Sequence, residues 1–394
     1  MAIERKNKDI EFMKVAINEA MKGVGKVNPN PLVGAVVVIE EQIIGKGYHE
    51  FYGGPHAEVN AIENAKNNLI AQGKSNSLED ATIYVTLEPC SHFGKTPPCA
   101  DLIIKNNIKR CVVGCIDPNP KVSGNGIKMI QDAGIDVQTG VLDSQCREIN
   151  KIFFKYIKEQ IPYIFLKCAI TLDGKIATKN GSSKWITNSK AREKVQYYRD
   201  KFMGIMVGKN TVINDNPQLK TALECGRNPY RIIFDSKLEI PEDYKIISEN
   251  SDFKTIIITS NENKWDGNSL NLEKKEKYNR LNIEYGIKFI TFKGDRFNMK
   301  EILVELGKLG IDAILVEGGE NIISQFFKEE LIDAGEIFIA PKILGDKEGI
   351  SFIGGFSKEK ISQCIELKNV KYNIYGDNIG VEFDFNRGEG CLLD

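Results

Sequence analysis

Hydrophobic positions in the first part of the chain follow two different spacings. Apolar residues recur at helical spacing over 9–22, 56–70, 99–107 and 126–133. Strands that alternate with helices are typical of a layered α/β domain, and we therefore predict such a domain over residues 1–146. The short, nearly continuous apolar runs that predict its strands lie at 32–40, 43–49, 81–88, 110–116 and 135–138.

A second series of apolar runs predicts another α/β domain over 162–394. The charged stretch 143–160 has helical spacing and stops at Ile161-Pro162, so we expect a linker over 147–161. Residues 260–285 are polar and predict a surface excursion. The halves share no internal repeat, which favours two unrelated α/β domains. The strands expected in the second domain lie at 163–170, 203–208, 230–235, 254–260, 287–292, 312–317 and 336–344, and its helices near 189–200, 298–309 and 320–330.

Composition narrows the class of protein. With 394 residues, 42% of them hydrophobic and 27% charged, the chain can form two ordinary cores. A formal net charge of -1 argues against a surface for long nucleic acid, and no apolar run approaches the roughly 20 residues of a membrane span. The charged amino terminus does not resemble a signal peptide, and nine scattered cysteines suit a reducing compartment. We expect a cytoplasmic protein whose partners are neither nucleic acid nor membrane.

One spacing in the first domain indicates hydrolytic metal chemistry. His56-Ala57-Glu58 is followed by Pro89-Cys90 and then by Cys99. One imidazole and two thiolates leave the fourth position of tetrahedral zinc open for water, whose pKa zinc lowers towards neutrality. This order is the signature of zinc-dependent nucleobase deaminases, in which the Glu moves protons and does not bind metal. The sequence predicts zinc on His56, Cys90 and Cys99, with Glu58 as the catalytic proton shuttle.

Two features of this motif leave alternatives open. The usual second half is Pro-Cys-x-x-Cys, whereas residues 91–98 separate the thiols here. A structural zinc is the alternative to a catalytic one, and His92 is then the candidate for a fourth ligand. We expect His56 and Glu58 at the opening of one helix and Cys99 at the opening of the next. A helix N-terminus favours thiolate over thiol, which suits metal binding by Cys99.

Further polar residues gather around the motif. The histidines of the chain, His49, His56 and His92, all lie in this segment, and that clustering favours a functional role over scattered structural ones. Lys95 lies between the thiols, where a cation suits an anionic group such as phosphate; a solvated loop lysine is the alternative. Asn30, in NPNPLVG, either meets the amide edge of a heterocycle or shapes the turn.

The second domain contains a candidate phosphate-binding turn. In AILVEGGENIISQFF, a buried strand and Glu317 precede two glycines and a helix. Glycines in this position let a pyrophosphate approach the free amides of the helix, although Gly-Gly often only turns the chain. The absence of GxGxxG disfavours a Rossmann fold. The stretch KCAITLDGKIA predicts a strand, a tight turn at Asp173-Gly174 and a second strand.

Longer stretches of the first domain resemble a known family. NPLVGAV, HAEVNAI and TLEPCSHFGKTPPC are similar to the deaminase half of the bifunctional riboflavin-biosynthesis deaminase–reductases, which carries the long spacer between the cysteines. The resemblance implies a cytidine-deaminase-like α/β/α sandwich and the zinc ligands and proton shuttle given above. Asp117 and Asn119, in DPNP, would hold ribose or phosphate, with turn formation as the alternative. The substrate contacts that the resemblance implies are Asn30, His49, His92, Lys95, Asp117 and Asn119.

The second domain resembles the reductase half of the same family, so that the resemblance covers essentially the whole chain. The similar stretches are KCAITLDGKIA, SKWIT, VGKNTVINDNP and VEGG. The resemblance implies a dihydrofolate-reductase-like fold that binds NADPH. The implied cofactor contacts are Ala169, Trp185, Thr211, Asp215, Ser236, Gly319, Glu320, Asn321, Ile322, Ile323, Ser324 and Gln325. The implied substrate contacts are Lys167, Ser183, Arg199, Leu219 and Glu317. From the residues alone, Trp185 could equally belong to the core.

Two departures from the family pattern concern the second domain. Asn216 stands where the family often has a second Asp, and Lys220-Thr221-Ala222 follows Leu219 where the family often carries a phosphate-binding arginine. Lys220 or Arg227 could substitute for that arginine. What binds phosphate in this half is therefore open.

We predict a bifunctional, homo-oligomeric enzyme of riboflavin biosynthesis that acts on small phosphoribosyl pyrimidines. The first domain would deaminate a phosphoribosylated diaminopyrimidinone with one zinc ion, and the second would use NADPH to reduce the ribose to a ribityl chain. The main alternative keeps the deaminase and makes the second domain a degenerate binding domain. Two further hypotheses are a nucleic-acid-editing deaminase and a structural zinc protein.

Overall fold

The computed structural model of the chain describes residues 2–92, 97–119, 122–224, 226–263, 272–293, 297–356 and 358–385. The chain divides into two compact units, Met1–Gln160 and Ile161–Asp394. None of the helices in these described ranges has the length and apolar content that a membrane span needs.

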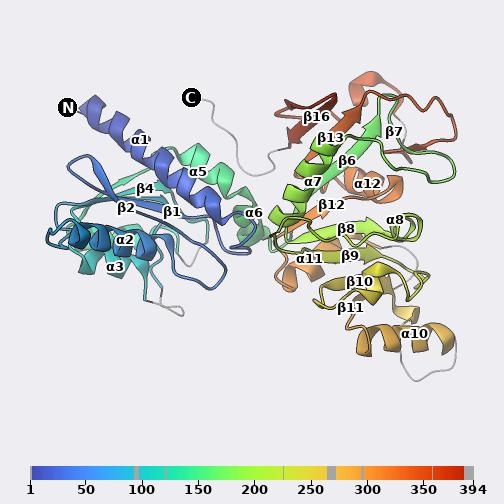
Figure 1. Cartoon of the computed structure of the whole chain (residues 1–394), viewed down its shortest axis with the longest axis horizontal. Coiled ribbons are helices and arrows are strands. Elements are labelled where there is room, and N and C mark those ends of the chain that lie inside the picture. The colour runs from blue at the N-terminus through green and yellow to red at the C-terminus, as the bar shows by residue number, and fades with distance from the viewer. Residues whose placement is uncertain are drawn as a thin grey trace. The chain divides into compact units, whose positions relative to one another are not determined.

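The first unit is a mixed sheet with helices on both faces, drawn in blue to green in Figure 1. The strand order is β2-β1-β3-β4-β5, with β1 antiparallel to β2 and β3, and with β3, β4 and β5 parallel. The strands are β1 (Gly34–Ile39), β2 (Gln42–Tyr48), β3 (Thr82–Leu87), β4 (Arg110–Cys115) and β5 (Asp136–Thr139). The helices are α1 (Ala2–Ala20), the 3-10 turn η1 (Met21–Gly23), α2 (Ala57–Ala71), α3 (Cys99–Lys105), α4 (Asn125–Asp132), α5 (Asp143–Ile149) and α6 (Lys151–Glu159).

Alternate residues of the central strands build the two layers of this core. Ala35 and Val37 of β1 pack in the cluster that holds α2, α3 and α4. Val36 and Val38 point the other way, into the cluster that holds α1, α5 and α6. The predicted α/β/α sandwich is confirmed.

Two boundaries differ from the sequence-based expectation. Helix α1 begins at Ala2 and not near residue 9, because its first turns are made of strong helix formers that carry no apolar stripe. Of the stretch 147–161, predicted as a linker, residues 147–160 are largely helical and group with the first unit, and Ile161 belongs to the second. Phe153 and Phe154 of α6 lie in the cluster beneath α1, and burial of these rings fixes the segment to the sheet.

Glycines on β2 bring α2 close to the sheet. A Cβ on Gly45 would meet the Ala61 carbonyl oxygen at 2.4 Å, and one on Gly47 would meet the Ala61 nitrogen at 2.3 Å. Only a strand without side chains at these positions lets the helix backbone approach this far. The start of α2, which carries His56 and Glu58, is thereby fixed.

The second unit is built on a larger sheet, drawn in green to red in Figure 1. The strand order is β11-β10-β9-β8-β12-β6-β13-β16-β15; the pairs from β11 to β13 are parallel, and β16 and β15 add antiparallel. The strands are β6 (Tyr163–Thr171), β7 (Lys175–Ala177), β8 (Gly204–Gly208), β9 (Tyr230–Phe234), β10 (Thr255–Ser260), β11 (Lys288–Phe292), β12 (Ala313–Val316), β13 (Ala334–Ala340), β14 (Ile350–Ser351), β15 (Lys371–Tyr375) and β16 (Asn378–Asp384). The helices are α7 (Ser189–Lys201), α8 (Lys209–Asp215), α9 (Lys245–Ser248), α10 (Leu272–Ile283), α11 (Met299–Lys308) and α12 (Glu320–Lys328), with the 3-10 turns η2 (Asn261–Asn263) and η3 (Ile361–Gln363).

Opposite faces of this sheet pack against different helices. Ile164 and Leu166 of β6 lie in the main core with α11 and α12. Phe165, between them, stacks on Phe202 and contacts Tyr198 of α7, with ring centroids 4.9 and 4.7 Å apart. The α/β class of the second domain is confirmed, as is the turn between β6 and β7.

Some elements of the second unit were not predicted. Helix α10 lies inside the polar excursion, and its charged sequence offers only a few apolar positions, such as Leu281. Strands β14, β15 and β16 were also missed, because much of β15 is exposed and its apolar residues do not read as a buried run.

Candidate active sites

His56, Cys90 and Cys99 come together in the first unit. Their ligand atoms all lie within 4.8 Å of one another, and in the part of the chain that the structure describes they form a group that could hold a metal ion. His56 Nδ1 is 3.2 Å from Cys99 Sγ and 3.6 Å from Cys90 Sγ. Tetrahedral zinc, with bonds of about 2.1 Å to nitrogen and 2.3 Å to sulfur, would separate these atoms by about 3.5 Å. The donor set and its spacing fit zinc.

The three ligands lie at the starts of two helices and just after a strand. His56 is the N-cap of α2 and Glu58 lies in the first turn of that helix, while Cys99 is the first residue of α3. Cys90 follows β3 after Glu88-Pro89, and the Cys99 N–H donates to its sulfur at 3.3 Å. A backbone N–H aimed at sulfur favours the thiolate.

The two thiols influence each other strongly. A hydrogen bond with Cys99, helped by His56, lowers the pKa of the Cys90 thiol to about 4. The neighbouring Cys90 sulfur, together with burial, raises the pKa of Cys99 well above its usual value. A divalent metal ion between the two sulfurs would favour the thiolate form of both.

Glu58 is a buried carboxyl group beside the metal ligands but outside the ligand set. It is 3% exposed, and burial raises the pKa of its carboxyl group to about 7, against the attraction of His56. A carboxyl group that gains and loses a proton near neutral pH suits general acid–base catalysis.

Asn30 and His49 lie next to this group. His49 Nδ1 donates to the Pro55 carbonyl oxygen at 2.9 Å, so its Nε2 accepts from Asn30 Nδ2 at 3.1 Å. Burial lowers the pKa of His49, which agrees with a neutral ring. The ring centroids of His49 and His56 are 5.7 Å apart. The structure thus places Asn30, and the His49 ring that it contacts, at the edge of the metal site.

The remaining predicted residues of the first site lie on two loops. Asp117 is buried and accepts the Asn119 N–H at 2.8 Å; burial raises the pKa of its carboxyl group. His92 is exposed and is not part of the metal group in the described residues. Lys95 lies outside the described residues.

A cavity of about 1080 Å³ lies in the second unit. This volume exceeds that of most small-molecule pockets and can hold a dinucleotide with a second ligand. The predicted substrate residues that line it are Lys167, Ser183, Arg199, Leu219 and Glu317. The predicted cofactor residues that line it are Ala169, Trp185, Thr211, Asp215, Gly319, Glu320, Asn321 and Ile322.

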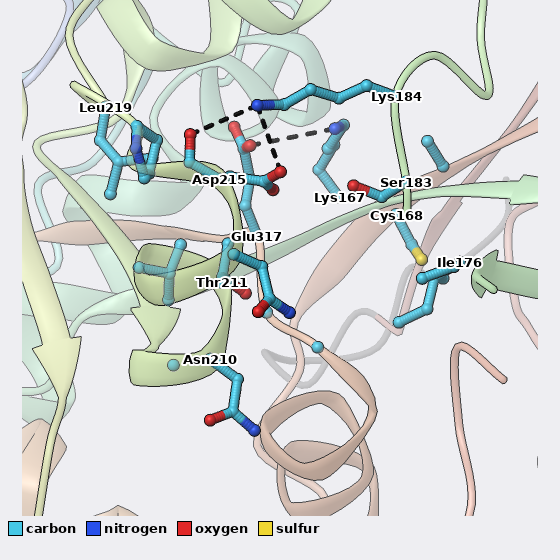
Figure 2. Close-up of a pocket in the computed structure, with 18 of the residues that line it drawn as sticks. Lys167, Cys168, Ile176, Ser183, Lys184, Asn210, Thr211, Asp215, Leu219 and Glu317 are labelled. Carbon is cyan, nitrogen blue, oxygen red and sulfur yellow. Dashed lines mark hydrogen bonds and ion pairs between the residues drawn. The ribbon is translucent and has the colours of Figure 1, made fainter. Parts of the chain in front are cut away.

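Ion pairs join residues that line this cavity, and Figure 2 shows those of Lys167 with Glu317 and of Lys184 with Asp215. Arg199 donates two hydrogen bonds to Glu317, at 3.2 and 3.0 Å, and Lys167 Nζ is 3.9 Å from the same carboxylate. Burial alone would raise the pKa of Glu317, but these cations lower it, so the carboxylate is charged. Lys184 Nζ pairs with Asp215 Oδ1 at 3.2 Å and with its carbonyl oxygen at 3.3 Å, as Figure 2 shows.

The structure does not bring every predicted cofactor residue to the cavity. Only the first turn of α12 faces it; Ile323 is buried in the main core, and Ser324 Oγ accepts the Gly354 N–H. Gln325 donates to the Phe297 carbonyl oxygen. Ser236 lies beyond the end of β9, where its carbonyl oxygen accepts from Asn263. The cavity meets the amino-terminal end of α12, and Ile323, Ser324 and Gln325 lie further along the helix.

Trp185 proves to be a cavity residue and not a core residue. It is 64% exposed, and the Arg192 guanidinium lies 4.7 Å from its ring centroid. Arg192, Val195, Gln196 and Arg199 line the cavity at helical spacing along α7, a signal that could have assigned Arg192 and Gln196 from the sequence. Lys220 does not line the cavity: its Nζ donates to the Glu249 carbonyl oxygen at 3.0 Å. Arg227 is not a lining residue either.

Comparison with known proteins agrees with both sites. Residues 162–380 match the family model described as the RibD C-terminal domain, and residues 6–115 match the cytidine and deoxycytidylate deaminase zinc-binding region. The riboflavin biosynthesis protein RibD of Aquifex aeolicus is 43% identical over 376 residues, which cover 95% of this chain and 98% of that protein. The chain belongs to the RibD family.

Solved RibD structures are similar over nearly the whole chain. A diaminohydroxyphosphoribosylaminopyrimidine deaminase/5-amino-6-(5-phosphoribosylamino)uracil reductase from Thermotoga maritima is 37% identical, with a TM-score of 0.81, and the match covers 96% of this chain and 99% of that one. Acinetobacter baumannii RibD gives a TM-score of 0.83 at 32% identity, with the same coverage.

Membership of the RibD family defines the class of enzyme. The chain is a bifunctional enzyme of riboflavin biosynthesis with a zinc-dependent deaminase unit and an NADPH-dependent reductase unit. The alternative of a degenerate carboxy-terminal domain is not supported, because the reductase family match extends over 162–380. The cytidine-deaminase-like and reductase folds implied by the resemblance are confirmed.

Proposed function

We propose that this chain deaminates a phosphoribosylated diaminopyrimidinone in its first unit and reduces the ribose of the product in its second. His56, Cys90 and Cys99 would hold zinc, which when bound supplies an acidified water as the nucleophile. The observation that supports this most directly is the convergence of these ligands beside a buried carboxyl group that is not one of them.

Glu58 is the group that moves protons in this proposal. It accepts a proton as water adds to the amino-bearing ring carbon and passes it to the neighbouring ring nitrogen. It then moves the second proton of the water to the departing nitrogen, so that ammonia leaves and a carbonyl remains. Burial raises the pKa of its carboxyl group to about 7, near that of a zinc-bound water. Asn30 and the neutral His49 would orient the heterocycle, and Asp117, Asn119, His92 and Lys95 would contact the rest of the substrate.

The second unit aligns two ligands in one cavity. NADPH, when bound, supplies the hydride that opens the ribose to a ribityl chain. We propose that the first turn of α12, with Trp185, Thr211 and Asp215, holds the cofactor. Lys167 and the Arg199–Glu317 pair would fix the ribose, and a partly buried, bidentate ion pair serves such alignment well. Ser183 and Leu219 complete the substrate wall.

The test is Glu58→Gln in the whole chain, with zinc content, deamination and NADPH oxidation measured side by side. We expect deamination to fall by about 10²–10⁴-fold because the proton shuttle is lost. Zinc should stay bound, and reduction of pre-deaminated substrate should be unchanged. Glu63→Gln, on an exposed residue of the same helix, is the matched control. Full deamination by the Glu58 variant would overturn the proposal.

We also propose a cytoplasmic, homo-oligomeric enzyme. The described cysteines are free thiols, which suits a reducing compartment. Light scattering on the purified protein measures the oligomeric state directly.

A further inference from the structure

Glu88 is a buried carboxylate that neither of the proposed reactions uses. It is 4% exposed and lies directly after β3, two positions before the ligand Cys90. Its own N–H donates to the carbonyl oxygen of Cys115, the last residue of β4, at 3.0 Å. Two chain segments leave the sheet side by side at Glu88. One is the segment Glu88–Cys90 after β3, here called the metal loop, and the other is the loop after β4.

The two oxygens of Glu88 accept hydrogen bonds from the loop that joins β4 to α4 and from the first turn of α4. Oε2 accepts the N–H of Asp117 at 3.3 Å and of Gly124 at 2.9 Å. Oε1 accepts the N–H of Gly126 at 3.0 Å and of Ile127 at 3.4 Å. Gly124 is the N-cap of α4, so the carboxylate occupies the start of that helix, where N–H groups lack partners within the helix.

Further hydrogen bonds join the described residues of this loop, which are 116–119 and 122–124. The Asn119 carbonyl oxygen accepts the N–H groups of Val122 and Ser123, both at 2.9 Å, and Asp117 accepts the Asn119 N–H. Glu88 thus joins Asp117, near the start of the loop, to Gly124 at its end. Hydrogen bonds within the loop hold the residues around Asp117 and Asn119.

Close backbone packing adds a second, independent constraint. A Cβ on Gly126 would lie 1.9 Å from the Pro89 carbonyl oxygen and 3.5 Å from Glu88 Cγ. The start of α4 therefore rests directly on the peptide that precedes Cys90. A side chain at 126 would separate α4 from both Pro89 and Glu88.

We infer that Glu88 is a positioning residue for substrate binding in the deaminase unit: it holds the Asp117–Asn119 loop in register with the metal loop. This inference rests on the proposed function, in which Asp117 and Asn119 contact the substrate. Glu88 itself touches neither metal nor substrate and acts through the backbone of both loops.

A carboxylate is required for this role because every partner is a donor. Glutamine has the same shape but offers one acceptor oxygen, and its amide N–H would face the N–H groups on the other side. The loop should then lose one pair of its hydrogen bonds while β3 and the Cys90 ligand stay in place. Such a change moves the substrate contacts and leaves the metal set intact.

The experiment compares the deaminase kinetics, the zinc content and the reductase activity of Glu88→Gln with those of the wild type, both as the full chain. We expect the KM for the deaminase substrate to rise about tenfold or more, with kcat changed by less than about threefold, because binding and not proton transfer is affected. Zinc should remain at the wild-type level per chain, and the reductase reaction on pre-deaminated substrate, an internal control in the same molecule, should be unchanged. Glu88→Asp, which keeps the charge, should recover part of the loss.

Gly126→Ala provides a second route to the same result. It keeps Glu88 but should push α4 away from it, so it should also raise the KM with zinc retained. Because both changes act on one contact, the double variant should be little worse than the poorer single variant. If Glu88→Gln does not fold, Gly126→Ala decides by the same measurements. The exposed Glu63→Gln is the matched control.

An unchanged KM, or a loss of zinc in step with the loss of activity, would overturn the inference. The proposed function fails differently: the wild-type chain would then not deaminate the substrate, or Glu58→Gln would remain active. A chain that deaminates, depends on Glu58 and tolerates Glu88→Gln contradicts the role of Glu88 alone.

Discussion

Arg192 and Arg199 stand on the same face of α7, but their charges are balanced differently. Arg199 forms a bidentate pair with Glu317, whereas Arg192 donates to the Thr187 carbonyl oxygen at 2.6 Å and lies over the Trp185 ring. Neither of these partners of Arg192 carries a negative charge. Among the described residues, Arg192 therefore brings a positive charge without a paired carboxylate to a cavity proposed to bind phosphorylated ligands. The chain also lacks the arginine that the family often carries after Leu219.

This difference predicts that Arg192 contributes to phosphate binding. Arg192→Gln should raise the KM of the reductase for NADPH or for the deaminated substrate by about tenfold, the equivalent of about 1.4 kcal/mol. Initial-rate kinetics with each ligand varied in turn identify which phosphate is involved. Deamination should not change. Lys190→Gln, an exposed position on the same helix, is the control, and an equal effect of both changes would refute the assignment.

The two buried carboxylates of the deaminase unit show what the sequence can reveal at this scale. Glu58 was predictable because it shares a short motif with His56, and local spacing carries that signal. Glu88 was not, because its partners lie on the loop after β4 and become neighbours only when β3 and β4 pair. The clustering of His49, His56 and His92 indicated a functional segment, but the contact of Asn30 with His49 became visible only in the fold.

Among the elements, α1 is fixed to the sheet by a buried charge pair. Asp9 receives two hydrogen bonds from Arg110 of β4, at 2.7 and 2.8 Å, and one from the Tyr84 hydroxyl at 2.9 Å. Burial alone would raise the pKa of Asp9, but the bonds from Arg110 and Tyr84 outweigh it and lower the pKa. The pair therefore stabilises the first unit only while Asp9 is ionised.

Asp9→Asn should destabilise the first unit by about 3 kcal/mol, because it leaves the buried Arg110 charge with the exposed Asp136 carboxylate, 3.3 Å from Nε, as its remaining counter-ion. Hydrogen exchange of α1 and β4 amides measures this locally. In the wild type, the contribution is complete above about pH 4 and is lost as the pH falls through the lowered pKa of Asp9. The Asp9 variant should lack that acid-dependent component. Glu11→Gln, on an exposed residue of α1, should behave as the wild type.

The predictability of elements followed their burial. Central strands such as β4, buried along its whole length, and amphipathic helices such as α11 were evident from the sequence. The edge strand β15 was not, because it is largely exposed and forms by pairing with β16. The charged helix α10 was not, because it has few apolar positions. Helix α6 was recognised as helical but assigned to a linker, since its apolar face gives no sign of which core it joins.

For the whole molecule, the main observation is that each site takes its described residues from one unit. The metal ligands and their neighbours lie between residues 30 and 127, and the lining of the reductase cavity lies between residues 167 and 350. The cores of the two units are separate clusters as well. A substitution in one site should therefore leave the chemistry of the other intact.

This separation has a genetic consequence. Two defective copies of the gene, one encoding Glu58→Gln and the other Glu317→Gln, should complement each other, since each polypeptide keeps the step that the other has lost. Cells expressing both should grow without added riboflavin, whereas cells expressing either alone should need it. Failure to complement, with both proteins present and folded, would mean that the two steps must occur on one and the same chain.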